Sequence, residues 1–257
     1  MTTPASNDPG FIDRPGGHRV AYHVTPGKSP GVVFLGGFMS DMTGTKAMAL
    51  EAHCRARSQA FLRFDYLGYG QSSGAFAEGT IGRWADDAMA AIDQLTEGPQ
   101  ILVGSSMGGW TMLLAALALG ERVCGLIGIA AAPDFTEDIM WEMFDDGQRK
   151  TLMEDGAVSI PSDYGDGAPY IISRALIEDG RDNLLLKDDI AIDCPVRLLQ
   201  GMKDADVPWR TALAVADKLT GGDVEVILVK DGDHRLSEPQ DLARLRVTLD
   251  RLIEQVG

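Results

Sequence analysis

A serine in a glycine-flanked segment is the residue of this sequence best placed for nucleophilic chemistry. The segment 104–108, Gly-Ser-Ser-Met-Gly, follows the apolar run 100–103 and precedes a longer apolar run, 109–119. This order predicts a strand, a sharp turn and a helix, with Ser106 at the apex of the turn. A serine hydroxyl is a weak nucleophile at neutral pH, so it needs a nearby base, and that base needs an acidic partner.

A second segment, 70–74, has the same Gly-x-Ser-x-Gly pattern, with Ser72 at its centre. It follows the turn-rich residues 65–69, and the residues after it, 75–80, have no helical apolar face. The setting is therefore that of a loop and not of a strand followed by a helix. We expect Ser72 to be a loop serine and Ser106 to be the nucleophile.

The base is almost dictated by the composition. The chain has four histidines, and His234 is the only one that follows Ser106. It comes directly after the apolar run 224–229, which predicts the last strand. Because the chain order in one large class of serine hydrolases is nucleophile, acid and base, this is where the base should lie. We predict that His234 accepts the proton of Ser106.

Two aspartates compete for the role of the acid. Asp204 and Asp206 both follow the predicted strand 195–199, in a loop with the pattern Gly-x-x-Asp-x-x-Val-Pro. That pattern places the first aspartate in the turn, so we favour Asp204. Asp206 would then be a cap or surface carboxylate near the helix expected from Pro208. The alternative, with Asp206 as the acid, stays open at this point.

Two backbone N–H groups are needed to stabilise the oxyanion that forms during acyl transfer. The residue after the nucleophile, Met107, is expected to supply one of them at the start of its helix. Phe38, in the Gly-Gly-Phe segment 36–38 after the apolar run 31–35, is expected to supply the other. The chemistry needs no cofactor and no metal ion, and the sequence predicts neither.

Apolar runs alternate with segments of helical periodicity along most of the chain, after a predicted hairpin at 11–25. The expected strands are 31–35, 60–64, 101–103, 123–131, 195–199 and 224–229, and the expected helices are 45–57, 81–95, 109–119, 209–219 and 239–256. Repeated strand–helix–strand units build a mostly parallel sheet with helices on both faces. The sequence therefore predicts one α/β domain over residues 1–257.

The segment 134–190 interrupts this alternation. It is rich in acidic residues, methionine and aromatic residues, and glycine and proline divide it into short pieces. Two or three short helices fit, such as 136–145 and 168–179. An insertion between two strands of the sheet is typical of a lid over an active site. The alternative is a packing excursion with no gating role.

The charge and the N-terminal segment limit the possible partners and locations. A net charge of −15 argues against nucleic acid and anionic membrane surfaces. No apolar run reaches the ~18 residues that a membrane span requires. Residues 1–10 contain no basic residue and no apolar core, so they predict neither a secretory signal nor a transit peptide. We expect a cytoplasmic location.

Several motifs occur in a familiar order over nearly the whole chain. They are Gly-Gly-Phe at 36–38, Asp-Tyr-x-Gly-x-Gly-x-Ser at 65–72, Gly-Ser-Ser-Met-Gly-Gly-Trp at 104–110, Gly-Met-Lys-Asp-x-x-Val-Pro-Trp at 201–209 and Asp-His-Arg at 233–235. With these motifs the chain resembles the α/β-hydrolases, in particular the group of a mitochondrial acyl-protein thioesterase and acyl-glucuronide esterase and its bacterial relatives. The resemblance implies the α/β-hydrolase fold and a triad of Ser106, Asp204 and His234.

The resemblance also implies a substrate class. We expect a serine hydrolase that cleaves an ester or thioester of a small molecule or an acylated protein through an acyl-enzyme. Two alternatives remain open. The same triad could serve a carbon–carbon bond hydrolase or a perhydrolase. A non-catalytic ligand-binding module on this fold is disfavoured, because such a module usually lacks one member of the triad.

Overall fold

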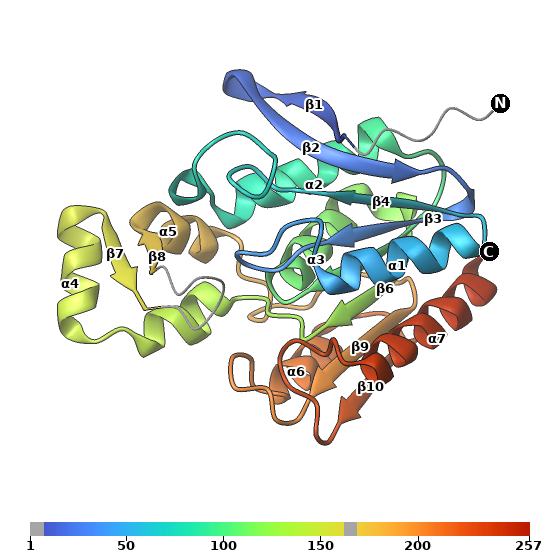
Figure 1. Cartoon of the computed structure of the whole chain (residues 1–257). Coiled ribbons are helices and arrows are strands. Elements are labelled where there is room, and N and C mark those ends of the chain that lie inside the picture. The colour runs from blue at the N-terminus through green and yellow to red at the C-terminus, as the bar shows by residue number, and fades with distance from the viewer. Residues whose placement is uncertain (1–7, 162–168) are drawn as a thin grey trace.

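The computed structural model describes residues 8–161 and 169–257, and its centre is an eight-stranded sheet (Figure 1). The strand order is β1-β2-β4-β3-β5-β6-β9-β10. The strands are β1 (Gly10–Arg14), β2 (His18–Thr25), β3 (Lys28–Leu35), β4 (Gln59–Phe64), β5 (Gln100–Ser105), β6 (Val123–Ile129), β9 (Val196–Gly201) and β10 (Val224–Val229). Neighbours from β4 to β10 are parallel, whereas β1 and β2 pair antiparallel at the edge. The predicted α/β fold class is confirmed.

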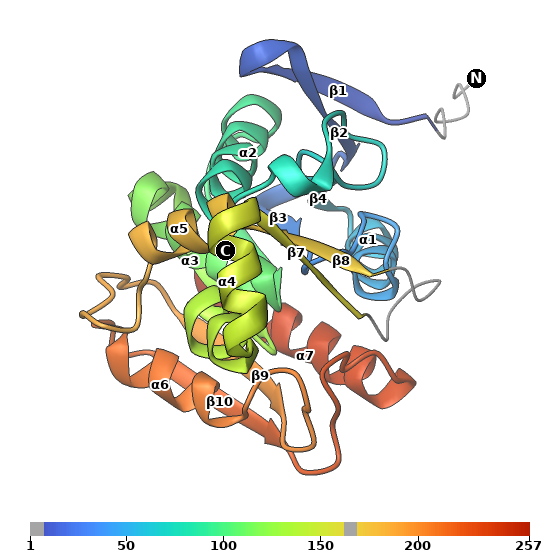
Figure 2. The same ribbon diagram turned by 90° about the vertical axis from the view of Figure 1, so that its left-hand side faces the viewer.

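Helices cover both faces of this sheet (Figures 1 and 2). One face carries α1 (Thr45–Ala56) and α7 (Pro239–Val256). The other carries α2 (Ile81–Leu95), α3 (Met107–Leu119) and α6 (Arg210–Lys218). Among the helices of the described residues, none is long and apolar enough to cross a membrane.

The central strands are continuous apolar runs because helices cover both faces of the sheet. Successive side chains of a strand point to opposite faces of the sheet. In β5, Ile101 and Val103 pack in the core beneath α1 and α7, whereas Leu102 packs in the core beneath α2 and α3. Every side chain of such a strand is therefore buried, and the strand ends where the polar residue Ser105 begins the turn to α3.

The residues between β6 and β9 form a separate small layer. They comprise a π-helical turn (Thr136–Trp141), α4 (Asp146–Asp155), β7 (Ala157–Ile160), β8 (Tyr170–Ser173) and α5 (Arg174–Asp182). β7 and β8 pair antiparallel as a two-stranded sheet. This layer lies past the arrowhead of β3 in Figure 1, and α4, β7 and β8 stand in front of the large sheet in Figure 2. The helical stretch predicted at 136–145 is present, with π-helical geometry.

The helix predicted over 168–179 is wrong in its first half. Its first residue lies outside the described residues, β8 begins at Tyr170, and α5 begins only afterwards. The Tyr-Ile-Ile sequence of β8 joins aromatic and β-branched residues, which favour a strand. Ser173 then caps α5, because its hydroxyl accepts a hydrogen bond from the backbone N–H of Leu176 at 3.1 Å.

A buried aspartate holds the two ends of this layer together. The carboxylate of Asp134 accepts hydrogen bonds from the backbone N–H groups of Leu185 and Leu186, each at 2.8 Å. Its side chain is buried, and burial raises the pKa of Asp134 although the two donors oppose that shift. The base of the inserted layer is therefore closed by a polar contact between residues about fifty positions apart.

Candidate active site

Ser106 occupies a strained turn between β5 and α3. Its backbone has φ 54° and ψ −121°, a conformation that residues other than glycine rarely adopt. The turn has no space for side chains at the two flanking glycines. A Cβ on Gly104 would overlap the carbonyl oxygen of Gly108, and a Cβ on Gly108 would overlap that of Leu35. The glycines of the motif therefore allow the sharp turn on which Ser106 lies.

Ser72, the centre of the competing motif, has a structural role in a loop. Its hydroxyl donates to the carbonyl oxygen of Asp65 at 2.6 Å and accepts from the backbone N–H of Ala21 at 2.8 Å. These bonds tie the loop after β4 to β2. The prediction that Ser72 is a loop serine is confirmed.

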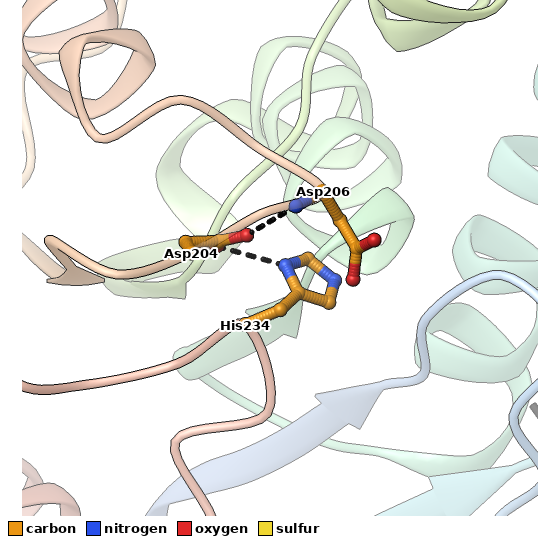
Figure 3. Close-up of side chains that lie close together, drawn as sticks. All are labelled: Asp204, Asp206 and His234. Atoms are coloured by element: carbon orange, nitrogen blue, oxygen red, sulfur yellow. Dashed lines mark hydrogen bonds and ion pairs between the residues drawn. The ribbon is translucent and has the colours of Figure 1, made fainter. Parts of the chain in front are cut away.

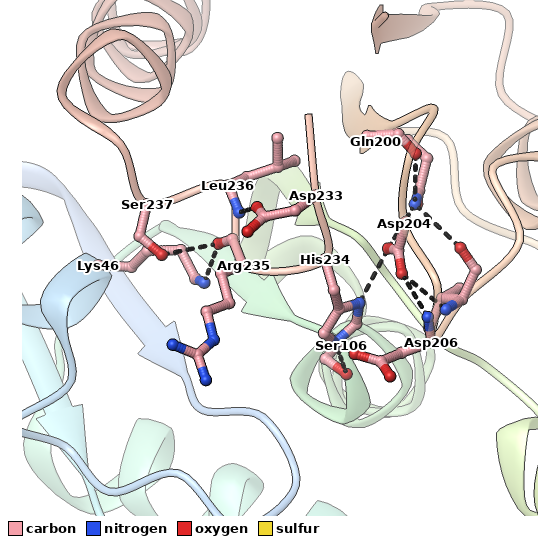
Figure 4. A network of polar contacts seen from close by, with 12 residues as sticks. Lys46, Ser106, Gln200, Asp204, Asp206, Asp233, His234, Arg235, Leu236 and Ser237 are labelled. Carbon is pink, nitrogen blue, oxygen red and sulfur yellow. Dashed lines mark hydrogen bonds and ion pairs between the residues drawn. The ribbon is translucent and has the colours of Figure 1, made fainter. Parts of the chain in front are cut away.

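His234 lies between Ser106 and Asp204 (Figure 4). Its Nε2 is 3.1 Å from the hydroxyl oxygen of Ser106, and its Nδ1 is 2.8 Å from Oδ2 of Asp204. The three residues come from the ends of β5, β9 and β10, so the parallel sheet brings them to one edge. Both distances are within the hydrogen-bond reach that a Ser–His–Asp triad requires.

The carboxylate of Asp204 is buried and has hydrogen-bond donors on both oxygens. Oδ1 accepts from the backbone N–H groups of Asp206 at 2.9 Å and Val207 at 2.8 Å. Oδ2 accepts from His234 and from Nε2 of Gln200, each at 2.8 Å. Burial is the strongest single influence and opposes ionisation. The hydrogen bond with His234 and the two backbone donors outweigh it together and hold the pKa of Asp204 below its usual value of 3.8.

Asp206 has a different position from Asp204. Its backbone N–H bonds Asp204, whereas its own carboxylate is exposed and points to the other side of the imidazole ring (Figure 3). It does not serve as the cap of α6, since Trp209 is the N-cap residue of that helix. The structure therefore brings Asp204, and not Asp206, to Nδ1 of His234.

The same three side chains are also the one group of possible metal ligands in residues 8–161 and 169–257. One donor atom from each of Asp204, Asp206 and His234 lies within 4.8 Å of the others. In the geometry observed, however, Asp204 and the Nδ1 of His234 bond each other and the Nε2 of His234 faces Ser106. The arrangement matches proton transfer better than metal binding.

The two predicted oxyanion donors belong to segments that lie next to Ser106. Met107 is the first residue of α3, where a backbone N–H has no acceptor within the helix. Phe38 follows Gly37, and a Cβ on Gly37 would be 3.3 Å from Cβ of Ser106, so this loop passes directly beside the serine. The role of Phe38 and Met107 as donors stays a prediction.

A cavity of about 670 Å³ opens above Ser106 and His234. One part, which we call the apolar part, is lined from the inserted layer by Ile139, Met140, Phe144, Ile160, Tyr170 and Ile172. The ring of Phe38 joins this part to the core, because it packs edge-on against Phe135 and Tyr170 at centroid distances of 5.7 and 5.9 Å. The cavity thus combines the reactive groups with a large apolar surface.

The other part of the cavity, which we call the basic part, contains Lys46 and Arg235. Lys46 donates from Nζ to the carbonyl oxygen of Arg235 at 2.5 Å, which holds the two residues together (Figure 4). The pKa of Lys46 is lowered to about 8, chiefly by burial and also by the charge of Arg235, although Asp233 and Asp241 oppose the shift. Two cationic side chains therefore line the same cavity as Ser106 and His234, together with the carboxylate of Asp206. Arg235 appears in the sequence patterns only as part of the Asp-His-Arg motif at 233–235, and no pattern indicates Lys46.

The strained serine turn, the Ser–His–Asp contacts and the parallel sheet together define an α/β-hydrolase. A model of the alpha/beta hydrolase family matches residues 32–245, and the chain belongs to that family. It is 44% identical to the human palmitoyl-protein thioesterase ABHD10, mitochondrial, over 96% of this chain and 80% of the relative.

Two solved structures have the same fold at similar identity. Alpha/beta hydrolase domain-containing protein 10 from mouse is 42% identical, with a TM-score of 0.89, over 97% of this chain and all of the mouse chain. A protein of Agrobacterium vitis S4, described as a hydrolase, is 40% identical, with a TM-score of 0.91, over 96% of this chain and 98% of that chain. The predicted resemblance and the prediction of a hydrolase are confirmed. The predicted cytoplasmic location is not supported, because the mammalian thioesterases are named as mitochondrial.

Proposed function

We propose that this protein is a serine hydrolase that cleaves carboxylic esters or thioesters through an acyl-enzyme on Ser106. The observation that carries the proposal is the continuous hydrogen-bonded chain from the hydroxyl of Ser106 through His234 to Asp204. Its direction fits acyl transfer, since the nucleophile meets Nε2 and the acid meets Nδ1. A ligand-binding module without catalysis would have no need of this alignment.

In the first half of the reaction, Nε2 of His234 accepts the proton of Ser106 as the serine oxygen attacks the acyl carbonyl carbon. Asp204 stays ionised and stabilises the imidazolium that forms. The backbone N–H groups of Phe38 and Met107 stabilise the oxyanion, and each such donor typically contributes ~3 kcal/mol to lowering the barrier. His234 then protonates the leaving group, which departs as an alcohol or thiol.

In the second half, His234 accepts a proton from water as the water oxygen attacks the acyl-enzyme. The acid is released, and the proton returns to Ser106. The same triad could in principle hydrolyse a carbon–carbon bond or carry out perhydrolysis. Esters and thioesters are favoured here because the relatives with more than 40% identity include proteins named as thioesterases.

For the acyl group we propose a long chain, and for one leaving group a protein cysteine. The apolar part of the cavity supports a long acyl chain, because its lining is almost entirely aliphatic and aromatic. The name of the human relative supports a palmitoylated protein. On this proposal residues 134–190 act as a lid within the single domain, since they supply most of the apolar lining.

The basic part of the cavity favours a second candidate, the cleavage of acyl glucuronides. A glucuronide leaving group carries a carboxylate close to the ester bond. Lys46 and Arg235 line the same cavity as Ser106 and could bind that carboxylate by charge-assisted hydrogen bonds. The two candidates share the acyl-enzyme chemistry and differ only in the leaving group.

Hydrolysis of matched substrates tests these proposals. Turnover of S-acyl peptides from two to sixteen carbons would be measured for the wild type, Ser106→Ala and the control variant Ser72→Ala. We expect Ser106→Ala to be inactive. The fraction of Ser72→Ala that folds should retain the turnover of the wild type, and long acyl chains should give the highest kcat/KM. Full activity of Ser106→Ala would refute the triad, and a preference for acetyl over long chains would refute the acyl proposal.

For the second candidate, the acyl glucuronide would be compared with the acyl glucoside, which lacks the carboxylate. Lys46→Met should lower kcat/KM about tenfold for the glucuronide, the loss expected for one hydrogen bond to a charged group, and leave the glucoside unchanged. Lys28→Met, at the distant start of β3, is the control. Equal losses on both substrates would show that Lys46 does not recognise the carboxylate.

A further inference from the structure

Gln200 is a fully buried polar residue beside the triad that the mechanism above does not use. It lies in β9, in a stretch where Val196, Leu198 and Leu199 belong to the apolar core, and its exposed fraction is 0%. Its amide Nε2 is 2.8 Å from Oδ2 of Asp204 (Figure 4). A buried amide at the end of an apolar strand is costly unless its hydrogen bonds are made.

Nε2 of Gln200 donates to the same carboxylate oxygen of Asp204 that bonds the imidazole ring of His234. Oδ2 of Asp204 is also the atom that bonds Nδ1 of His234 at 2.8 Å. The other oxygen, Oδ1, is held by two backbone donors. With Gln200 in place, each oxygen has two donors, so the plane and the direction of the carboxylate are fixed. Without it, the bond to His234 would be the only one that holds Oδ2.

The remaining contacts of the Gln200 amide indicate that this residue contributes little to the stability of the fold. Its Nε2 also approaches the carbonyl oxygens of Val207 at 3.3 Å, across the loop that carries Asp204, and of Gly201 at 3.4 Å. Its Oε1 is buried and has no hydrogen-bond partner among the described residues. An amide with an unpartnered oxygen offsets much of what its donor contributes to folding. A methionine of similar size would be buried there without that cost.

We propose that Gln200 is a positioning residue for catalysis, whose amide keeps the carboxylate of Asp204 ionised and turned toward His234. This inference rests on the proposed triad mechanism. The donor stabilises the charged carboxylate, so the carboxylate does not take the proton of the imidazolium during the reaction. Gln200 does not line the cavity, so it does not contact the acyl group or the leaving group of a bound substrate. Its effect should therefore fall on kcat and not on KM.

Three variants test the inference. Gln200→Met removes the donor with little change in volume, and Gln200→Leu removes it with a smaller apolar side chain. The matched control is Gln100→Met. Gln100 is 1% exposed on β5, and its Nε2 donates to the carbonyl oxygens of Glu97 and Gly98, far from the site. The measurements are kcat and KM for a nitrophenyl acyl ester, with thermal unfolding to check that each variant folds.

We expect both Gln200 variants to lower kcat about tenfold to hundredfold, the range for one hydrogen bond to a charged group, with KM changed less than about twofold. Gln100→Met should lower the unfolding temperature and leave kcat unchanged. Wild-type kcat in Gln200→Met would overturn the inference. So would equal losses of kcat in Gln200→Met and Gln100→Met, because a loss of packing would then explain both. If Gln200→Met fails to fold, Gln200→Leu decides in its place.

A double-mutant cycle separates this inference from the triad itself. In the Asp204→Asn background, Gln200→Met should change kcat by less than about twofold, because the carboxylate through which it acts is gone. Losses that multiply would show that Gln200 acts elsewhere and would overturn the inference. If Asp204→Asn alone keeps wild-type activity, the triad proposal fails instead. A loss of activity in Asp204→Asn with none in Gln200→Met refutes only the inference about Gln200.

Discussion

Replacement of Asp204 with asparagine should be far more damaging than the loss of one charge suggests. In one orientation the new amide nitrogen faces Nδ1 of His234 and Nε2 of Gln200, which are both donors toward that position. In the flipped orientation it faces the backbone N–H groups of Asp206 and Val207, which are donors as well. In either orientation, two of these four donors therefore face the N–H groups of the new amide and lose their acceptor.

The magnitudes follow from these contacts. Loss of the ionised carboxylate removes the group that selects the tautomer of His234, and kcat should fall about 10⁴-fold, as for an Asp→Asn change in another Ser–His–Asp triad. Each buried donor left unpaired costs ~1–3 kcal/mol, so the free energy of unfolding should also fall measurably. KM should change little, because Asp204 is fully buried behind His234 and does not line the cavity.

The assay compares Asp204→Asn with Asp206→Asn on one acyl ester, together with denaturant unfolding of both. Asp206 is exposed and lines the cavity, so Asp206→Asn should keep kcat within about tenfold and leave stability within the ±0.5 kcal/mol of a surface change. The reverse pattern, with an inactive Asp206→Asn and an active Asp204→Asn, would refute the assignment of the acid.

Three further outcomes follow from the structure. Because the folded-state pKa of Asp204 is lowered, its contribution to stability is fully present above its usual pKa of 3.8. The stability difference between the wild type and Asp204→Asn should therefore shrink only as the pH of the unfolding measurement falls below that value. Lys46 is charged below its pKa of about 8, so the preference for an acyl glucuronide over an acyl glucoside should decline as the assay pH rises from 7 to 9; a constant ratio would contradict its role. Asp134→Ala leaves the N–H groups of Leu185 and Leu186 without their acceptor and should lower the free energy of unfolding by ~1–3 kcal/mol, as denaturant titration would show, whereas Asp138→Ala, on the neighbouring turn, should have little effect.

The residues that local patterns describe were predictable from the sequence. A Cβ on Gly104 would meet the backbone of Gly108 four positions later, so the motif and the turn coincide, whereas Gly108 is required by the approach of Leu35 on the neighbouring strand β3. The competing serine, Ser72, was separated from Ser106 by the secondary structure expected on each side of it. His234 followed from the composition, since no other histidine comes after the nucleophile. Each of these inferences depended on local pattern, composition or chain order.

Contacts between distant segments were not predictable in the same way. Lys46 and Arg235 meet across 189 positions, and neither belongs to a local pattern that indicates an anion site. Gln200 was hidden in a run that otherwise indicates a buried strand, although a polar residue four positions before the favoured aspartate is a signal in retrospect. In the insertion, the sequence predicts a helix where β8 lies, because a strand of four residues has too few apolar positions to distinguish the period of a strand from that of a helix.

The most direct measurement is the site of covalent labelling by a fluorophosphonate, which reacts with an activated serine and stays attached. The wild-type protein would be labelled, digested and analysed by mass spectrometry, with His234→Ala and Asp204→Asn as slow-reacting comparisons. The mechanism predicts one phosphonate, on Ser106, and a labelling rate that falls in both variants. A label on Ser72, or no label on folded wild-type protein, would contradict it.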